Sequence, residues 1–561
     1  MNEKTKTGLE ILEAALLLGI LGDVLLRETP WGLNVLLFVG ALVAAMVMLT
    51  LRRRSEFLTA PIIALHAALI FFAAMFVWRD SMELKIFDTF AVITILGLLT
   101  LPVLKIKVKT AGVIHYFYAA LWSGISAAFA PFFLLIDDVK WKTIPQTGWS
   151  KHLIAVLRGL AIATPILLIF GALFVAADAV FQGIVEKTFN IRPDVLVSHI
   201  ALAGFLAWIV AGYLRGSLME SFSTNAAENL LAGKETMKPP TLSITQEVKD
   251  ETKTDAKTET KPPEAKKTWE KKTWDWRNFD NSILPNAFTL GAIEVSVVLG
   301  LINLLFLSFV IVQIPYLFGG MDLVQNTPDF KLADYARRGF GELVTVAALV
   351  LPILLTSHWL LRKDSPVNEK IYRVLAGINV GLLFVIMISA AQRLFLLTGN
   401  LGYGLTTIRF YPMVVMLWLA IVFGWFCLTV LRGSRDKFAW GALWSAAFIL
   451  GTLHVVNPDD FIARTNIRLM NEGRIFDARY NSNLSDDAVP VLLENLPSMN
   501  NEQQCVVKIG ILDHLYKSDS ENDFRSWNWS RYKARKEIEI QKEDLIPMGC
   551  PAYTQSPRAD F

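Results

Sequence analysis

The chain has 561 residues, of which 53% are hydrophobic and 19% are charged, and its formal net charge at pH 7 is +3. A soluble domain usually has about 25% charged residues, so this composition excludes an ordinary soluble protein and favours an all-α integral membrane protein surrounded by membrane lipids. The small net charge gives no reason to expect a nucleic-acid partner.

Eleven stretches are long and apolar enough to cross a bilayer, for which a helix needs roughly 20 mostly apolar residues. They lie at 9–26, 33–51, 57–78, 86–104, 152–180, 195–214, 286–314, 341–361, 371–391, 411–431 and 438–456. Helices in a soluble core alternate polar and apolar faces, whereas these are apolar all round. The first stretch carries three acidic residues and leads straight into more membrane sequence, so we expect it to be retained rather than cleaved as a signal peptide.

A further apolar stretch, 112–136, has lysines before it at 105–109 and after it at 140–151. Both flanks therefore favour the cytoplasmic side. Twenty-five residues are too few for two crossings, and Ser123, Gly124 and Pro131 interrupt the stretch. We expect a re-entrant or interfacial segment; a full twelfth crossing is the alternative.

Basic residues in the short loops predict the orientation of the chain. Arginines at 52–54, Arg362 with Lys363, and the basic loop 432–437 each follow a membrane stretch. Placing these loops in the cytoplasm puts the N-terminus inside and the C-terminus outside.

Four regions are expected along the chain. These are an N-terminal membrane half (1–214), a polar linker (215–284), a C-terminal membrane half (285–456) and a mostly helical polar tail (457–561). The linker has twelve basic and twelve acidic residues, a composition typical of disorder. Its repeated KKTW, at 266–269 and 271–274, suits either an anionic headgroup layer or a solvated tether.

Five sequence segments resemble a known family. They are LINLLFLSFVIVQIPYLFGG (301–320), DYARRGFGEL (334–343), NPDDFIARTN (457–466), YNSNLSDDAVPVLLENL (480–496) and RSWNWSRYKAR (525–535). Together they resemble the bacterial membrane family called domain of unknown function 4173, from about 286 to 536. The N-terminal half is less similar, and ADAVF at 177–181 has Ala179 where the family has proline. The resemblance implies a bacterial inner (plasma) membrane protein and brings no established activity, cofactor or catalytic residue.

Charged residues are dense around the loop 315–340, which the charge pattern places outside. Asp334, Arg338 and Glu342 are spaced to lie on one helix face, and Arg337 points to another. We predict a charged outer vestibule that binds an anion or phosphate; the alternative is a network tying the loop to the tail. Its candidate members are Asp334, Tyr335, Arg337, Arg338, Glu342, Asp459 and Arg464.

Polar residues inside the membrane stretches are a second candidate group: Glu294, Asn303, Gln313, Asn379, Gln392 and Arg393. Intramembrane polar groups mark either a transport pathway or helix packing. His66, His358 and His454 have no second ligand at helical spacing, so no metal site is expected. Each is expected to be a hydrogen-bonded packing histidine, and His454 is interpreted as lying at a helix end that meets water.

Three cysteines exclude a disulfide scaffold and an all-cysteine zinc site. Cys505 and Cys550 both lie in the tail, where an oxidising compartment would allow them to form a disulfide. No cofactor is expected. The leading hypothesis is a non-enzymatic envelope sensor, scaffold or assembly protein with an envelope protein partner. The alternatives are a transporter or lipid-handling protein, and a membrane enzyme acting on a lipid-linked phosphate.

Overall fold

The computed structural model describes residues 2–141, 193–219, 281, 289–318, 340–362, 365–395, 398, 404–519, 523–545 and 550. Within these ranges every regular element is a helix and there is no β-strand, so the all-α prediction is confirmed. Nine helices in the described part are long and apolar enough to cross a membrane.

Eight of the eleven predicted membrane stretches are among those nine helices. The stretches at 9–26 and 86–104 are helical too, but the first carries several charges and the helix in the second has only 17 residues. The stretch 152–180 lies outside the described residues. The ninth helix contains the stretch 112–136.

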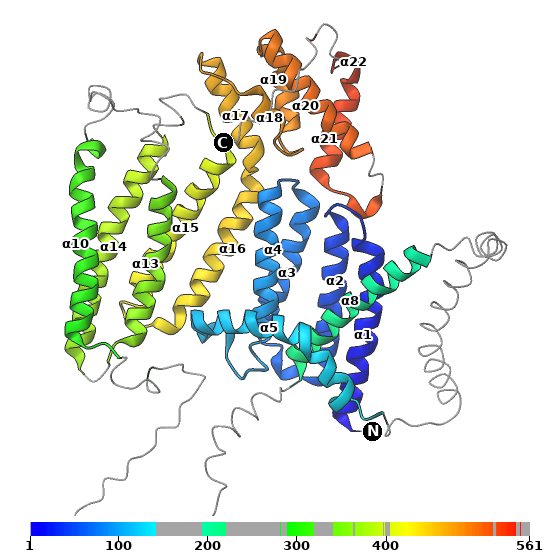
Figure 1. Ribbon diagram of the computed structural model, residues 1–561, viewed down its shortest axis with the longest axis vertical. Helices are drawn as coiled ribbons and strands as arrows, with labels where there is room; N and C mark the ends of the chain where they lie inside the picture. Colours follow the sequence, from blue (N-terminus) through cyan, green and yellow to red (C-terminus); the bar gives the residue numbers. More distant parts are fainter. Residues whose placement is uncertain are drawn as a thin grey trace, which may run out of the picture.

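The N-terminal half is built on four upright helices that stand side by side (Figure 1). They are α1 (Glu3–Leu26), α2 (Leu33–Arg53), α3 (Ala60–Trp78) and α4 (Met82–Leu98). Short turns join them, and one hydrophobic core runs through the group. Pro61 in the first turn of α3 is a favourable helix start, because the amide it lacks would have no partner there.

Helix α8 (Pro193–Leu218) packs against α1 and α5. The Asp23 carboxylate binds the His199 ring near one end of α8, and Arg215 binds Asp138 near the other. Asp23 is near the end of α1, whereas Asp138, which follows α5, is hydrogen-bonded to Thr5 at the start of α1. Helix α8 therefore runs antiparallel to α1.

Helix α5 (Val113–Phe133) lies across the foot of the upright helices (Figure 1). The short helix η2 (Val108–Thr110) before it contacts the 435–437 turn. After it, the Thr5 hydroxyl at the start of α1 donates to the carbonyl oxygen of Asp138 at 3.1 Å. Both flanks of α5 therefore lie at the face where α1 begins, which supports the interfacial placement over a twelfth crossing.

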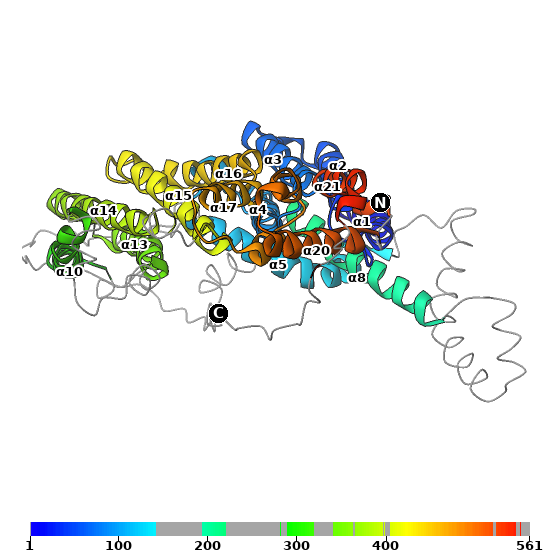
Figure 2. The same ribbon diagram turned by 90° about the horizontal axis from the view of Figure 1, so that it is seen from above.

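The C-terminal half contains α10 (Ala292–Phe318), α13 (Phe340–Leu360), α14 (Pro366–Phe395), α15 (Thr407–Thr429) and α16 (Phe438–Val456). A second hydrophobic core joins these helices. Seen from above, α15 and α16 stand between the group α10, α13 and α14 and the N-terminal helices (Figure 2). Helix α16 contributes Phe438 to the second core, while Leu443, Ala447 and Leu450 pack against the first.

The tail folds into a helical domain, 457–545, which we call the tail domain. Its helices are α17 (Pro458–Asn471), α18 (Ala478–Ser482), α19 (Val489–Asn495), α20 (Asn501–Asp519), α21 (Trp529–Ile540) and α22 (Lys542–Leu545). It has a core of its own and lies over the N-terminal half, at the opposite end of the bundle from the start of α1 (Figures 1 and 2).

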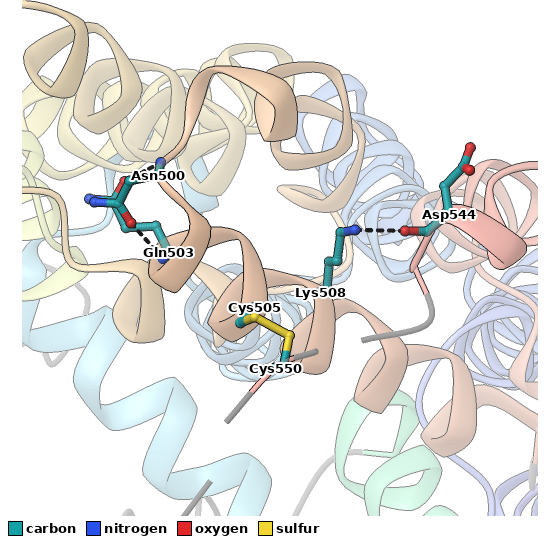
Figure 3. Close-up of a disulfide and its surroundings, with 6 residues drawn as sticks. All are labelled: Asn500, Gln503, Cys505, Lys508, Asp544 and Cys550. Atoms are coloured by element: carbon teal, nitrogen blue, oxygen red, sulfur yellow. Dashed lines mark hydrogen bonds between the residues drawn. A yellow bond between two sulfur atoms is a disulfide. The ribbon is translucent and has the colours of Figure 1, made fainter. Parts of the chain in front are cut away.

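The predicted disulfide between Cys505 and Cys550 is present, with 5.7 Å between the two Cα atoms (Figure 3). It fixes residue 550 to α20. The same helix is capped by reciprocal bonds between Asn500 and Gln503, and the Lys508 ammonium donates to the carbonyl oxygen of Asp544 at 2.7 Å. These contacts hold the end of the described chain against α20.

Asn457 alone connects α16 to α17. Its φ of 57° lies in the left-handed region, which asparagine tolerates better than most residues. Its amide donates to the Leu453 carbonyl of α16, and its own carbonyl accepts from Phe461 of α17. The membrane helix and the tail domain therefore meet at a one-residue corner that is hydrogen-bonded on both sides.

Candidate functional site

A buried polar cluster forms where the tail domain meets the turn between α3 and α4. We call it the junction cluster. Its members come from that turn, α4, α15, α16, and the three tail segments singled out in the sequence: Arg79, Asp80, Ser81, Glu83, Lys85, Asp88, Tyr411, His454, Asp459, Ser485, Asp487, Asn528, Ser530 and Arg531. Segments more than 400 positions apart in the sequence thus build one site.

Arg79 and Asp487 form the centre of the cluster. The guanidinium donates to the Asp487 carboxylate at 3.0 Å and to the carbonyl oxygen of His454 at 2.7 Å. The Asp487 side chain is 1% exposed, and it also accepts from the amide of Asp80 and the hydroxyl of Ser530. A buried carboxylate is tolerated only when it is paired and hydrogen-bonded, and here both conditions are met.

Two tail side chains cap the end of α3. The Asn528 amide donates to the carbonyl oxygens of Phe76 and Arg79, each at 2.8 Å, and the Ser530 hydroxyl donates to that of Trp78 at 2.9 Å. The last carbonyls of a helix have no partner inside the helix. Segment 528–530 of the tail supplies those partners, so the end of α3 is completed by the tail domain.

A second ion-pair group lies next to the first. The Lys85 ammonium is 2.7 Å from a carboxylate oxygen of Asp80, and Nε of Arg531 is 3.1 Å from the same oxygen. All three side chains are largely buried. One acid from the turn is therefore shared by a cation from α4 and a cation from the tail.

His454 and Asp88 form a pair between α16 and α4. Nε2 of His454 is 3.0 Å from the Asp88 carboxylate, and the two side chains are 0% and 1% exposed. His454 is therefore a hydrogen-bonded packing histidine, as expected, although it does not meet water. The tail domain covers the end of α16, and the acid from α4 supplies the polar partner that water would otherwise provide.

Asp459 lies at the edge of the cluster and is buried. One of its oxygens accepts from the amide and hydroxyl of Ser485, while its other oxygen has no hydrogen-bond partner among the described residues. Burial raises the pKa of this carboxyl to about 6, and the nearby charges of Glu83 and Asp487 act in the same direction. Asp459 therefore takes up a proton more readily than an ordinary aspartate.

This arrangement joins the tail domain to the α3–α4 turn through hydrogen bonds and an ion pair. The cluster contains serine hydroxyls, but Ser485 and Ser530 donate to carboxylates, and neither is hydrogen-bonded to a histidine base of the kind that activates a serine nucleophile. Among the described residues, no group of three or more His, Cys, Asp or Glu could hold a metal ion.

A protein-family model matches most of this chain. The model of the family described as Domain of unknown function (DUF4153) matches residues 66–495. The chain belongs to this family. The family number expected from the sequence, 4173, is therefore wrong, although both names denote a domain of unknown function. No curated protein and no solved structure matches this DUF4153 member.

Of the residues that the sequence grouped as an outer vestibule, only the two tail members have described side chains. Asp334, Tyr335, Arg337 and Arg338 lie outside the described residues. Glu342 is in the first turn of α13, and its side chain is not described. Of the two tail members, Asp459 belongs to the junction cluster, whereas Arg464 is on the tail surface in ion pairs with Asp460 and Glu494.

The intramembrane candidates do not form one group in the described part of the structure. Asn379 of α14 donates to the Asn303 side chain of α10 at 2.8 Å, and Asn303 donates to the carbonyl oxygen of Leu375. This pair ties two helices together, as packing would require. Glu294 caps the start of its own helix by accepting from the amide of Gly291. The remaining candidates, Gln313, Gln392 and Arg393, are in α10 and α14, and the side chains of Gln313 and Arg393 are not described.

Sequence reasoning missed most of the junction cluster, although one signal was available. Asp88 is an acid inside a stretch that was read as membrane-spanning, and such acids usually have a partner within the protein. The partner, His454, lies 366 positions away, and no local spacing pattern connects the two residues.

Proposed function

We propose that this DUF4153 protein is a non-enzymatic protein of the bacterial inner membrane that holds its tail domain in a fixed orientation for another envelope protein. In this proposal the N-terminus faces the cytoplasm, the tail domain lies outside, and the protein acts as a scaffold or sensor. The observation that carries the proposal is the buried Arg79–Asp487 pair. A buried ion pair contributes little net stability but can specify one arrangement of the two parts that it joins. A tail domain that moved freely on a flexible tether would not require such a pair.

Aromatic residues on the tail support a position directly on the bilayer surface. Trp527, Trp529 and Tyr532 are each at least 40% exposed and form consecutive ring contacts. The carbonyl oxygen of Trp527 accepts from the amide of Leu33, at the start of α2. Exposed tryptophan and tyrosine at the level of a helix end are typical of the membrane–water interface.

The test is to release the tail domain without removing it. Arg79→Ala is expected to leave the amount of protein in the membrane near normal, to increase amide exchange in the tail domain, and to reduce complementation of a deletion strain. Arg464→Ala, which breaks two surface ion pairs, is the matched control and should complement fully. Full complementation by an Arg79→Ala protein whose tail is demonstrably released would overturn the proposal.

Orientation needs its own measurement. Reporter fusions at positions 240 and 540 should show cytoplasmic activity at the first site and extracytoplasmic activity at the second, because Lys and Arg are concentrated in the loops assigned to the inside. Cytoplasmic activity at both sites would contradict the proposed topology.

A further inference from the structure

A cavity of about 370 Å³ lies between the two membrane halves. Its walls come from α3 and α4 of the N-terminal half and from α15 and α16 of the C-terminal half, and they are almost entirely apolar. Representative lining residues are Leu65, Thr94, Trp418 and Ala447. We call this cavity the lateral groove.

The lateral groove is open along one edge and closed along another. Phe90, one of its lining residues, is 63% exposed. Since α4 stands among the membrane helices, that edge faces lipid. Behind it, the Trp418 indole donates to the Ser445 hydroxyl at 3.2 Å and joins α15 to α16. A molecule would therefore enter sideways, from the bilayer.

The depth of the groove matches one leaflet. Its lining on α16 runs from Leu443 to Leu453, which is about 15 Å at the rise of an α-helix. The hydrocarbon core of a bilayer is about 30 Å thick, so the groove covers about half of it. Leu453 is near the tail-domain end of α16, which assigns the groove to the leaflet on that side.

Apart from the Thr94 hydroxyl and the indole nitrogens of Trp418 and Trp444, the polar group of the lining is the Tyr411 hydroxyl, at the tail-domain end. Tyr411 lines the groove, and its hydroxyl is 3.3 Å from the Ser81 hydroxyl of the junction cluster. Glu83 accepts from the same serine. An occupant that is apolar along its length and polar at one end would place the polar end here.

From this geometry we infer that the lateral groove binds one hydrocarbon chain of a membrane lipid from the leaflet on the tail-domain side. Entry from the bilayer, an apolar wall and a depth of one leaflet all fit a single acyl chain. A transmembrane helix does not fit this depth, because it would need the full thickness of the hydrocarbon core. The lipid site lies directly beneath the junction cluster, through Tyr411 and Ser81.

The experiment uses the full chain in nanodiscs that contain phosphatidylethanolamine with a photoactivatable diazirine in one acyl chain. After illumination, peptide mass spectrometry should find adducts concentrated on the groove walls of α15 and α16. Thr94→Trp fills the groove from α4, where the side chain is exposed, and should reduce those adducts about tenfold, a change equivalent to about 1.4 kcal/mol of affinity.

The matched control is Ile93→Trp, one residue away on the same helix, 53% exposed and not part of the lining. It should leave the adducts unchanged. Equal adduct yields in the two variants, or adducts spread evenly over the lipid-facing helices, would mean ordinary surrounding lipid only and would overturn the inference. A crosslink from the groove wall to a second protein segment would overturn it as well. Retention of the Cys505–Cys550 disulfide and a normal elution volume would show that both variants fold.

Discussion

Replacing Arg79 with alanine should release the tail domain from the membrane helices. The change removes the guanidinium that donates to Asp487, together with a hydrogen bond to the His454 carbonyl. Losing one partner of a buried ion pair typically costs about 3–5 kcal/mol. Because Asp487 keeps donors from Asp80 and Ser530, we expect the lower end, about 3 kcal/mol.

Hydrogen exchange measured by mass spectrometry can detect this loss directly. A cost of about 3 kcal/mol corresponds to an increase of about 10²-fold in the population of the released state. Amides of α19 and α21, which lie in the tail domain, should exchange faster by that factor, while amides of α1 and α2 should change little. Arg464 is half-exposed in its ion pair, so Arg464→Ala should change exchange by well under tenfold, since exposed pairs contribute about 0–1 kcal/mol. Unchanged exchange in Arg79→Ala would refute the view that this pair holds the tail domain.

Three further predictions concern other parts of the molecule. The raised pKa of Asp459, about 6, means that the folded state binds its proton more tightly than the unfolded state. The tail domain should therefore lose about 2 kcal/mol of stability as pH rises from 4 to 7, and Asp459→Asn should flatten that dependence in thermal melts. Cys505→Ser opens a loop of 45 residues and should cost about 4 kcal/mol by the chain-entropy model; the wild type should shift on a reducing gel and the variant should not. Cysteines placed at Thr110 and Lys140 should react with an impermeant reagent from the same side of the membrane, and labelling from opposite sides would make α5 a crossing helix.

Composition and hydropathy were sufficient to predict the membrane helices, because a helix surrounded by lipid must be apolar over its whole surface. Charge at both flanks likewise led to the expectation that 112–136 lies at the membrane interface, which the position of α5 across the foot of the upright helices supports (Figure 1). These features depend on residues near each other in the chain, so the pattern is visible without knowledge of the fold.

The junction cluster could not be predicted in the same way. Arg79 and Asp487 are each unremarkable in a turn or polar segment, and their pairing depends on how the tail domain packs on α3 and α4. The three tail segments were recognised by resemblance to a family. Their sequences alone did not show that Ser485 would donate to Asp459, or that Ser530 would donate to Asp487. The dense charge around 315–340 was instead taken to mark the functional site. It predicted an outer vestibule, several of whose residues lie outside the described ranges.

The one-residue corner at Asn457 has a mechanical consequence. Helix α16 packs against both membrane cores, and α17 leaves it with no intervening loop. The 14 residues of α17 extend about 21 Å, so a tilt of about 10° in α16, if α17 followed it rigidly, would move the far end of α17 by about 4 Å. No flexible loop stands at this corner to absorb such a tilt, so a change in the direction of α16 would be transmitted directly to the first helix of the tail domain.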